Sequence, residues 1–133
     1  MIVNPIISVI ASGIKVELWK GLYESLAKNN VEFEIIITGH VRPNFKLPSN
    51  FKFIFSKTKP SQCAEISARN ASGEYTMLIG DDIYFSPYYL DRILEFYKQN
   101  CTFKDCASGR FTRGDLEYTK DNGFVDGVTA PTI

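Results

Sequence analysis

The sequence predicts an α/β protein, a three-layer α/β/α fold with a mostly parallel sheet. Short apolar runs alternate with segments of helical periodicity along residues 6–97, and such alternation is typical of a parallel sheet with right-handed crossovers. The run Ile35–Ile37 is apolar on both faces, as a strand covered by helices on both sides would be. The length of 133 residues and the ordinary 44% of hydrophobic residues fit one globular domain, which we expect to span residues 1–133.

The first half of the chain carries signals for two strands and a helix. The apolar, β-branched run at residues 6–10 predicts the first strand. Apolar residues then recur at helical spacing over 16–26, and Asn29-Asn30 ends that pattern. A second strand is predicted at 35–38.

The second half repeats this alternation. After a loop with two prolines, residues 51–55 predict a third strand. We expect a helix at 61–70 with Ser61 as its N-cap, and a fourth strand at 75–79. From Pro87, which suits the first position of a helix, a strongly amphipathic helix is predicted.

The pattern weakens after residue 101. Residues 109–119 alternate loosely, Asn122-Gly123 is a hairpin-type turn signal, and Phe124-Val125 predicts a short strand.

Composition excludes several classes of function. Lys plus Arg (15) balance Asp plus Glu (15), so no positive field favours nucleic acid or an anionic membrane surface. The three cysteines form neither an even set nor a CxxC pair, which favours a reduced intracellular setting over zinc or disulfide chemistry. The first ten residues lack the basic leader of a signal peptide, and no run approaches the roughly 18 apolar residues of a spanning helix. We therefore expect a cytoplasmic protein without a transmembrane segment, at most peripheral to a membrane.

Two adjacent acids, Asp81 and Asp82, follow the predicted fourth strand directly. In an open parallel sheet, ligands bind beyond the carboxyl ends of the strands. Two carboxylates there repel each other unless a cation joins them, and Mg²⁺ or Mn²⁺ accepts one or two carboxylates together with water and phosphate. The alternative is a turn or helix-capping pair before Pro87.

The segment 71–87, Ala-Ser-Gly-Glu-Tyr-Thr-Met-Leu-Ile-Gly-Asp-Asp-Ile-Tyr-Phe-Ser-Pro, resembles the donor-binding half of A-fold, family-two-type glycosyltransferases. In that family, a Gly-Glu-Tyr sequence enters a strand that ends in an Asp-x-Asp motif. Residues 5–10 and 33–37 are similar to the family's first two strands. The resemblance implies a nucleotide-diphospho-sugar transferase-like fold. It also implies hexosyl transfer, inverting by family resemblance, from a nucleotide-diphosphate sugar to a saccharide or lipid-linked acceptor.

Carried over to this sequence, Asp82 matches the motif's last aspartate, a metal ligand for Mn²⁺ or Mg²⁺. Asp81 matches its middle position and is a second candidate for contact with the metal or the ribose. Gly80 stands where the family has its first aspartate.

Four further residues are candidate nucleotide-sugar-binding residues by this resemblance. Ser12 matches the polar loop after the first strand, or is a plain turn residue. His40 stands after the second strand, where the family has an acidic pair for the base, and is a base contact or a solvated loop residue. Gln62 lies in the region that flanks the donor, as does Arg69, which either binds phosphate as a bidentate cation or is a solvated helix charge.

No motif identifies a catalytic base. Few residues follow the last predicted helix, so we expect donor binding to be easier to detect than sugar transfer. The alternative function is a non-catalytic nucleotide-sugar-binding or interaction module of the same fold, and a phosphoacceptor-type signalling domain is a third. The acids available as a base are Asp105, Asp115, Glu117, Asp121 and Asp126.

Overall fold

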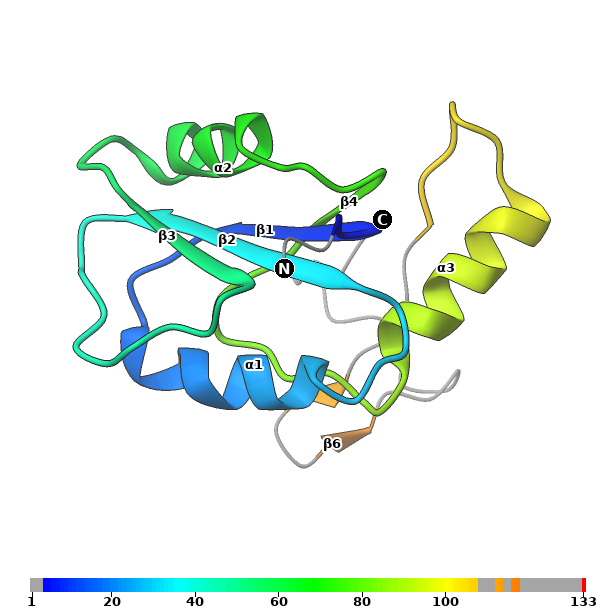
Figure 1. Cartoon of the computed structure of the whole chain (residues 1–133), viewed down its shortest axis with the longest axis horizontal. Coiled ribbons are helices and arrows are strands. Elements are labelled where there is room, and N and C mark those ends of the chain that lie inside the picture. The colour runs from blue at the N-terminus through cyan, green and yellow to red at the C-terminus, as the bar shows by residue number, and fades with distance from the viewer. Residues whose placement is uncertain (1–3, 108–111, 114–115, 118–132) are drawn as a thin grey trace.

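Four parallel strands form a sheet in the order β3-β2-β1-β4 (Figure 1). The structure is a computed structural model that describes residues 4–107, 112–113, 116–117 and 133. The four strands predicted within residues 6–79 are all present, in one sheet, and they are parallel as expected. Their bounds are Ile7–Ser12 for β1, Phe33–Gly39 for β2, Phe51–Phe55 for β3 and Tyr75–Leu78 for β4.

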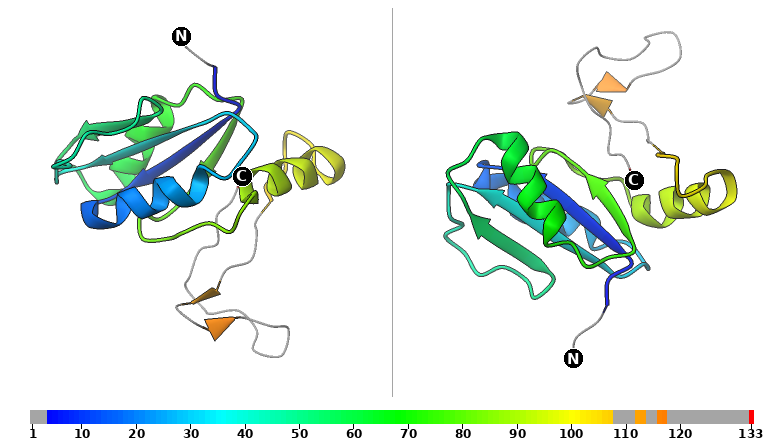
Figure 2. Two further views of the ribbon diagram at one scale, coloured as in Figure 1. Left: turned by 60° about the horizontal axis from the view of Figure 1, so that its bottom comes forward. Right: turned by 90° about the horizontal axis from the view of Figure 1, so that it is seen from above.

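Helices cover both faces of the sheet, which gives the three predicted layers. Figure 1 shows α1 on one face and α2 on the other, and Figure 2 shows α3 beyond one end of the sheet. None of the helices in the described part of the chain has the length and apolar character that crossing a bilayer requires. A short 3-10 helix, η1, spans Val16–Leu18 and leads into α1 at Trp19–Leu26, while α2 spans Pro60–Arg69 and α3 spans Tyr89–Asn100.

The core between α1 and the sheet is built on the single tryptophan. Trp19 is fully buried, and its ring lies 5.9 Å from that of Phe51 and 5.8 Å from that of Phe53. Both phenylalanines lie on the same face of β3 because side chains alternate along a strand. The apolar residues of β1 and β2 at alternate positions complete this core.

Two helices begin at positions that differ from the predicted ones. Ser61 is not the N-cap of α2: Pro60 takes the first helical position, which a residue without a backbone N–H tolerates well, and Lys59 becomes the cap. The third helix begins at Tyr89 and not at Pro87. Tyr88 has a left-handed backbone (φ 62°), so the chain makes a turn there before the helix can start.

The turn after α1 joins the amino-terminal end of α3. The Asp91 carboxylate accepts hydrogen bonds from the backbone N–H groups of Asn30 and Val31, both at 2.8 Å. The Asn29 side chain accepts in turn from the N–H of Leu90 at 2.9 Å. These bonds hold α3 at the end of the sheet where β2 begins.

Between the sheet and the chain that enters β4 lies a buried carboxylate. Glu34 on β2 is 3% exposed and accepts hydrogen bonds from Ser8 Oγ (2.6 Å), Ser72 N (2.7 Å), Ser72 Oγ (2.8 Å) and Lys52 Nζ (3.0 Å). Burial by itself would raise the pKa of Glu34, but these four donors together lower it from 4.5 to about 2. Glu34 is therefore an ionised group that connects three strands and the loop before the fourth.

The C-terminal part contributes one small antiparallel pair. Thr112–Arg113 (β5) pairs with Leu116–Glu117 (β6), so the stretch 109–119 that alternates loosely in the sequence includes an antiparallel strand pair. The backbones of Ala107 and Ile133 also exchange two hydrogen bonds. The turn signal at 122–123 and the strand predicted at 124–125 lie outside the described residues.

Candidate functional site

The sheet has a topological switch point between β1 and β4. From β1 the chain adds β2 and then β3 on one side, and then returns to add β4 on the other side of β1. The connection through α1 covers one face and the connection through α2 covers the other (Figure 1). The carboxyl ends of β1 and β4 are therefore the place where an open α/β sheet most often binds a ligand. The segments that meet there are residues 13–15 and 80–82.

Asp81 joins these two segments through a buried carboxylate. It is 7% exposed, and its Oδ2 accepts hydrogen bonds from the backbone N–H of Lys15 (2.8 Å) and from the indole N–H of Trp19 (3.0 Å). Gly13 makes this approach possible, because a Cβ atom there would overlap the Asp81 carboxylate. Through these bonds Oδ2 of Asp81 holds the start of η1 and α1 against the end of β4, whereas the capping alternative had placed it before the helix that follows Pro87.

Asp82 lies beside a cation that sequence reasoning did not select. Its Oδ2 is 3.0 Å from the ammonium of Lys15, and both side chains are half exposed, at 48% and 50%. The hydrogen bond from Lys15 to Asp82 and the charge of that carboxylate raise the pKa of Lys15 above its ordinary value of 10.5. One of the two adjacent carboxylates, that of Asp82, thus has a cation of the chain itself as its partner. The position of Lys15 in the loop after the first predicted strand is the signal that could have identified it.

Ser12 and His40 reach the same edge of the sheet as the acidic pair. Ser12 is the last residue of β1, half-buried beside Thr38 of β2, and the exposed His40 directly follows β2. Between them Gly39 allows the two backbones to approach, because a Cβ atom there would overlap the carbonyl oxygen of Gly13. This edge thus combines the hydroxyl of Ser12 and the imidazole of His40 with the carboxylates of the loop after β4.

The two candidate residues on α2, Gln62 and Arg69, lie at opposite ends of that helix. Gln62 lies in the first turn, at the end of α2 that follows β3, and its Oε1 accepts a hydrogen bond from the N–H of Lys59 at 3.1 Å. Arg69 lies in the last turn, roughly 10 Å further along the helix axis, where its guanidinium is 3.2 Å from Glu65. The structure brings Gln62 to the edge with the strand ends as a capping residue and leaves Arg69 in an exposed pair on the helix surface.

A planar pair of side chains at the end of β3 was also missed by sequence reasoning. The Arg42 guanidinium lies over the ring of Phe55, 4.3 Å from its centroid, and Phe55 is 39% exposed. Aromatic rings and guanidinium planes are surfaces on which nucleobases stack. Nothing in the sequence signals the pair, because Arg42 comes from the loop after β2 and Phe55 ends the next strand.

Among the candidate bases, the structure describes the side chain of Asp105 alone. Its Oδ2 accepts hydrogen bonds from the backbone N–H (2.8 Å) and the hydroxyl (3.2 Å) of Thr102, so it stabilises a turn after α3. Glu117 is described as part of β6 without its side chain. The other three acids, at positions 115, 121 and 126, lie outside the described residues.

Asp81→Ala is expected to lower the free energy of unfolding by about 1 to 2 kcal/mol, because it leaves the buried indole N–H of Trp19 without its acceptor. Urea denaturation followed by fluorescence measures this directly, since Trp19 is the only tryptophan. Asp82→Ala is the matched control: it breaks a half-exposed ion pair and should change stability by less than about 0.5 kcal/mol. Equal losses in the two variants would contradict the structural role assigned to Asp81.

Comparisons with known proteins connect this geometry to a fold family. No family model and no curated protein matches the chain. Among solved structures, the chain is similar to residues 1–349 of S. aureus TarS, with a TM-score of 0.57 and 20% identity over 80% of this chain and 41% of that one. A second TarS structure gives a TM-score of 0.53 and 19% identity over 70% of this chain and 19% of that one. The chain thus spans less than half the length of either structure.

TarS is a glycosyltransferase. The similarity confirms the predicted fold: the chain has a glycosyltransferase-like α/β fold of the nucleotide-sugar transferase type.

Proposed function

We propose that the chain binds the nucleotide-diphosphate end of a sugar donor at the carboxyl ends of β1 and β4, as the donor-binding part of a glycosyltransferase. The observation that carries this proposal is the position of the acidic loop. Asp81 and Asp82 meet the loop after β1 at the switch point of the sheet, where α/β proteins bind their ligands. The fold shared with TarS also supports sugar transfer as the class of reaction.

The two acids differ in how available their carboxylates are to a divalent cation. Asp81 Oδ2 already accepts two hydrogen bonds, whereas Asp82 is half exposed and makes one solvated ion pair. In the part of the chain that the structure describes, no cluster of three or more His, Cys, Asp or Glu residues forms a complete protein site. Mg²⁺ or Mn²⁺ commonly takes few carboxylates and fills its remaining positions with water and substrate phosphates. Asp82 together with a donor diphosphate therefore fits such an ion, which would offset charge on the leaving diphosphate.

The nucleoside end of the donor has candidate partners along the same edge. Ser12 and His40 stand at the ends of β1 and β2, and the Arg42–Phe55 pair stands at the end of β3. A hydroxyl, an imidazole and a planar cation supply the hydrogen bonds and the stacking surface that a nucleoside requires. The acceptor would be a saccharide or a lipid-linked saccharide.

Donor binding without turnover is the second candidate function. The Asp105 carboxylate is engaged in its own turn, and Asp81, the more buried acid of the pair, already accepts two hydrogen bonds. In the described part of the chain, each of these two carboxylates thus has structural partners at Oδ2. A binding assay therefore tests the proposal better than a transfer assay.

The central experiment is calorimetry of the chain with ADP, CDP, GDP and UDP and their sugar conjugates, with and without Mn²⁺. We expect one nucleotide to bind in preference to the others, with higher affinity when Mn²⁺ is present. Absence of binding to every nucleotide under both conditions would refute the proposed function.

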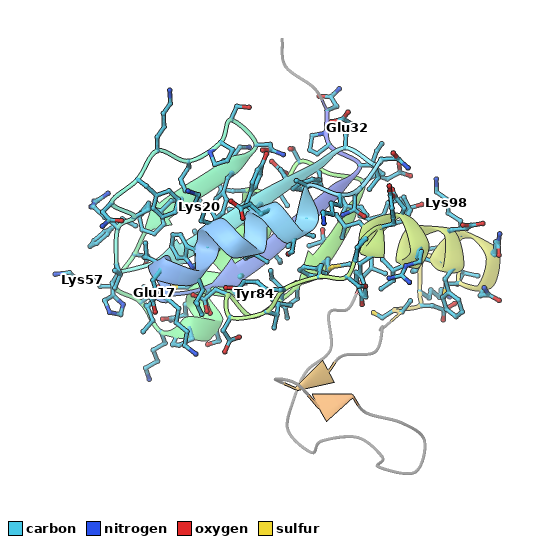
Figure 3. The ribbon with its side chains drawn as sticks, turned by 90° about the horizontal axis from the view of Figure 1, so that it is seen from below. Glu17, Lys20, Glu32, Lys57, Tyr84 and Lys98 are labelled. Carbon is cyan, nitrogen blue, oxygen red and sulfur yellow. The ribbon has the colours of Figure 1, made fainter. Side chains whose placement is uncertain are left out.

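Asp82→Asn is expected to weaken Mn²⁺-dependent binding of the preferred nucleoside diphosphate at least about tenfold, or roughly 1.4 kcal/mol. The fold should remain intact because Asp82 is half exposed. The control is Glu17→Gln, which removes the same charge from an exposed residue in η1 (Figure 3). Unchanged binding in the Asp82 variant, or an equal loss in the Glu17 variant, would exclude a specific role for Asp82.

A further inference from the structure

Lys15 contacts the acidic pair, Asp81 and Asp82, through both its backbone and its side chain. Its backbone N–H donates to Asp81 Oδ2 at 2.8 Å, and its ammonium donates to Asp82 Oδ2 at 3.0 Å. The backbone bond is made to a buried carboxylate, which fixes the position of the main chain. The side chain is 50% exposed, and its ammonium stands at the end of a flexible four-carbon stem. The ammonium can therefore move while the main chain of Lys15 stays in place.

The ammonium and a divalent cation would compete for the same carboxylate. Asp82, whose Oδ2 the ammonium contacts, is also the more exposed carboxylate of the acidic pair. A divalent ion bound there repels a nearby ammonium, and the local charge of the loop then favours an added anion. A donor diphosphate is such an anion.

We propose that Lys15 is a phosphate-binding residue of the donor site: its ammonium is held by Asp82 in the free chain and transfers to the donor diphosphate when the donor binds. This inference rests on the proposed function. It adds that the free chain carries its own cation at the acidic pair, so that a divalent ion binds Asp82 only by displacing Lys15. Lys15 therefore lowers the affinity of the free chain for metal and raises its affinity for the nucleotide.

An ordinary surface ion pair would behave differently. Half-exposed pairs contribute little to stability and have no required effect on ligand binding. A purely structural Lys15 would still compete with a metal ion for Asp82, but removing its ammonium would leave the affinity for the nucleotide unchanged. The proposal instead requires the affinities for metal and nucleotide to change in opposite directions.

The test compares the wild-type chain with Lys15→Met, Lys15→Arg and Lys20→Met. Lys20 is an exposed lysine on the surface of α1 (Figure 3), so Lys20→Met makes the same chemical change away from the acidic pair. One titration measures binding of Mn²⁺ alone by electron paramagnetic resonance. A second measures, by calorimetry in metal-free buffer with chelator, binding of the tightest nucleoside diphosphate among ADP, CDP, GDP and UDP.

Lys15→Met should bind Mn²⁺ alone at least about threefold more tightly and bind the nucleoside diphosphate about tenfold more weakly, a difference of roughly 1.4 kcal/mol. Lys15→Arg should retain nucleotide binding, because a guanidinium also pairs with phosphate. Lys20→Met should match the wild type in both titrations. The backbone N–H of residue 15 remains in every variant, so the bond to Asp81 and the fold are preserved.

Two failures can be separated. If the wild-type chain binds none of the four nucleoside diphosphates with or without Mn²⁺, the proposed function is wrong, and the role of Lys15 is refuted with it. If the wild-type chain binds a nucleotide and Lys15→Met binds that nucleotide with wild-type affinity, whatever its affinity for Mn²⁺, the proposed function stands and the role of Lys15 is refuted.

Discussion

Glu34→Gln should lower the free energy of unfolding by about 2 to 3 kcal/mol at pH 7. The substitution keeps the shape of the side chain but removes the charge that four hydrogen-bond donors surround, and it places an amide N–H₂ among those donors. The fall of the Glu34 pKa from 4.5 to about 2 corresponds to about 3 kcal/mol, and solvent at the half-exposed Lys52 reduces that value. Urea denaturation at pH 7 measures the loss.

The Glu34 carboxylate also makes the free energy of unfolding depend on pH. Since the pKa of Glu34 is lowered in the folded chain, its contribution is fully present above about pH 4.5 and is lost as the pH falls toward 2. The difference in unfolding free energy between wild type and Glu34→Gln should shrink across that window. Glu32→Gln is the matched control, because Glu32 is exposed two residues earlier (Figure 3). A difference that stays constant from pH 5 to pH 2 would show that Glu34 is not stabilised in its charged form.

Gly39→Ala should destabilise the chain by about 3 kcal/mol or more. A Cβ atom at position 39 would overlap the carbonyl oxygen of Gly13, and a backbone atom in the neighbouring loop has no rotamer through which to move away. Relief would require the ends of β1 and β2 to separate, at the edge where Ser12 and His40 lie. Thermal or urea denaturation measures the loss.

Gly80→Ala provides the control for that substitution. A Cβ atom there would lie 3.1 Å from Asp82 Oδ1, the end of a half-exposed side chain that can rotate. We expect a change of less than about 1 kcal/mol. If Gly39→Ala were as mild as Gly80→Ala, the two strand ends would not be held at the close approach that the structure describes.

Local patterns in the sequence were sufficient to predict the fold. Apolar runs identified all four strands, and the third strand was predicted with its observed bounds of 51–55. Helical periodicity identified the three main helices. The errors fall at the helix starts, where Pro60 and the left-handed backbone of Tyr88 decide the boundary. Such starts depend on the turn geometry of the preceding residues, which a periodic pattern does not contain.

The site was only partly predictable, because its contacts join distant parts of the chain. The position of Asp81 and Asp82 after a strand predicted that they lie at the ligand-binding edge. That Asp81 contacts Lys15 and Trp19 could not be predicted, because 66 and 62 residues separate these partners in the sequence. The burial of Glu34 has the same origin, since its donors come from two other strands and from the loop before β4. Side-chain partners of this kind are set by strand order and register.

The strand order also has a consequence for the nascent chain during translation. Strand β1 leaves the ribosome before the other three strands of its sheet and becomes an interior strand, and its partner on one side, β4, is made only after β2, β3 and α2. Until then one edge of β1 offers unpaired backbone groups, which is a hazard for aggregation. The loop that carries Asp81 is synthesised directly after β4, so its bonds to Lys15 and Trp19 form only once that edge is covered. The edge that carries the acidic loop is thus completed in the same late step that protects β1 from pairing with other chains.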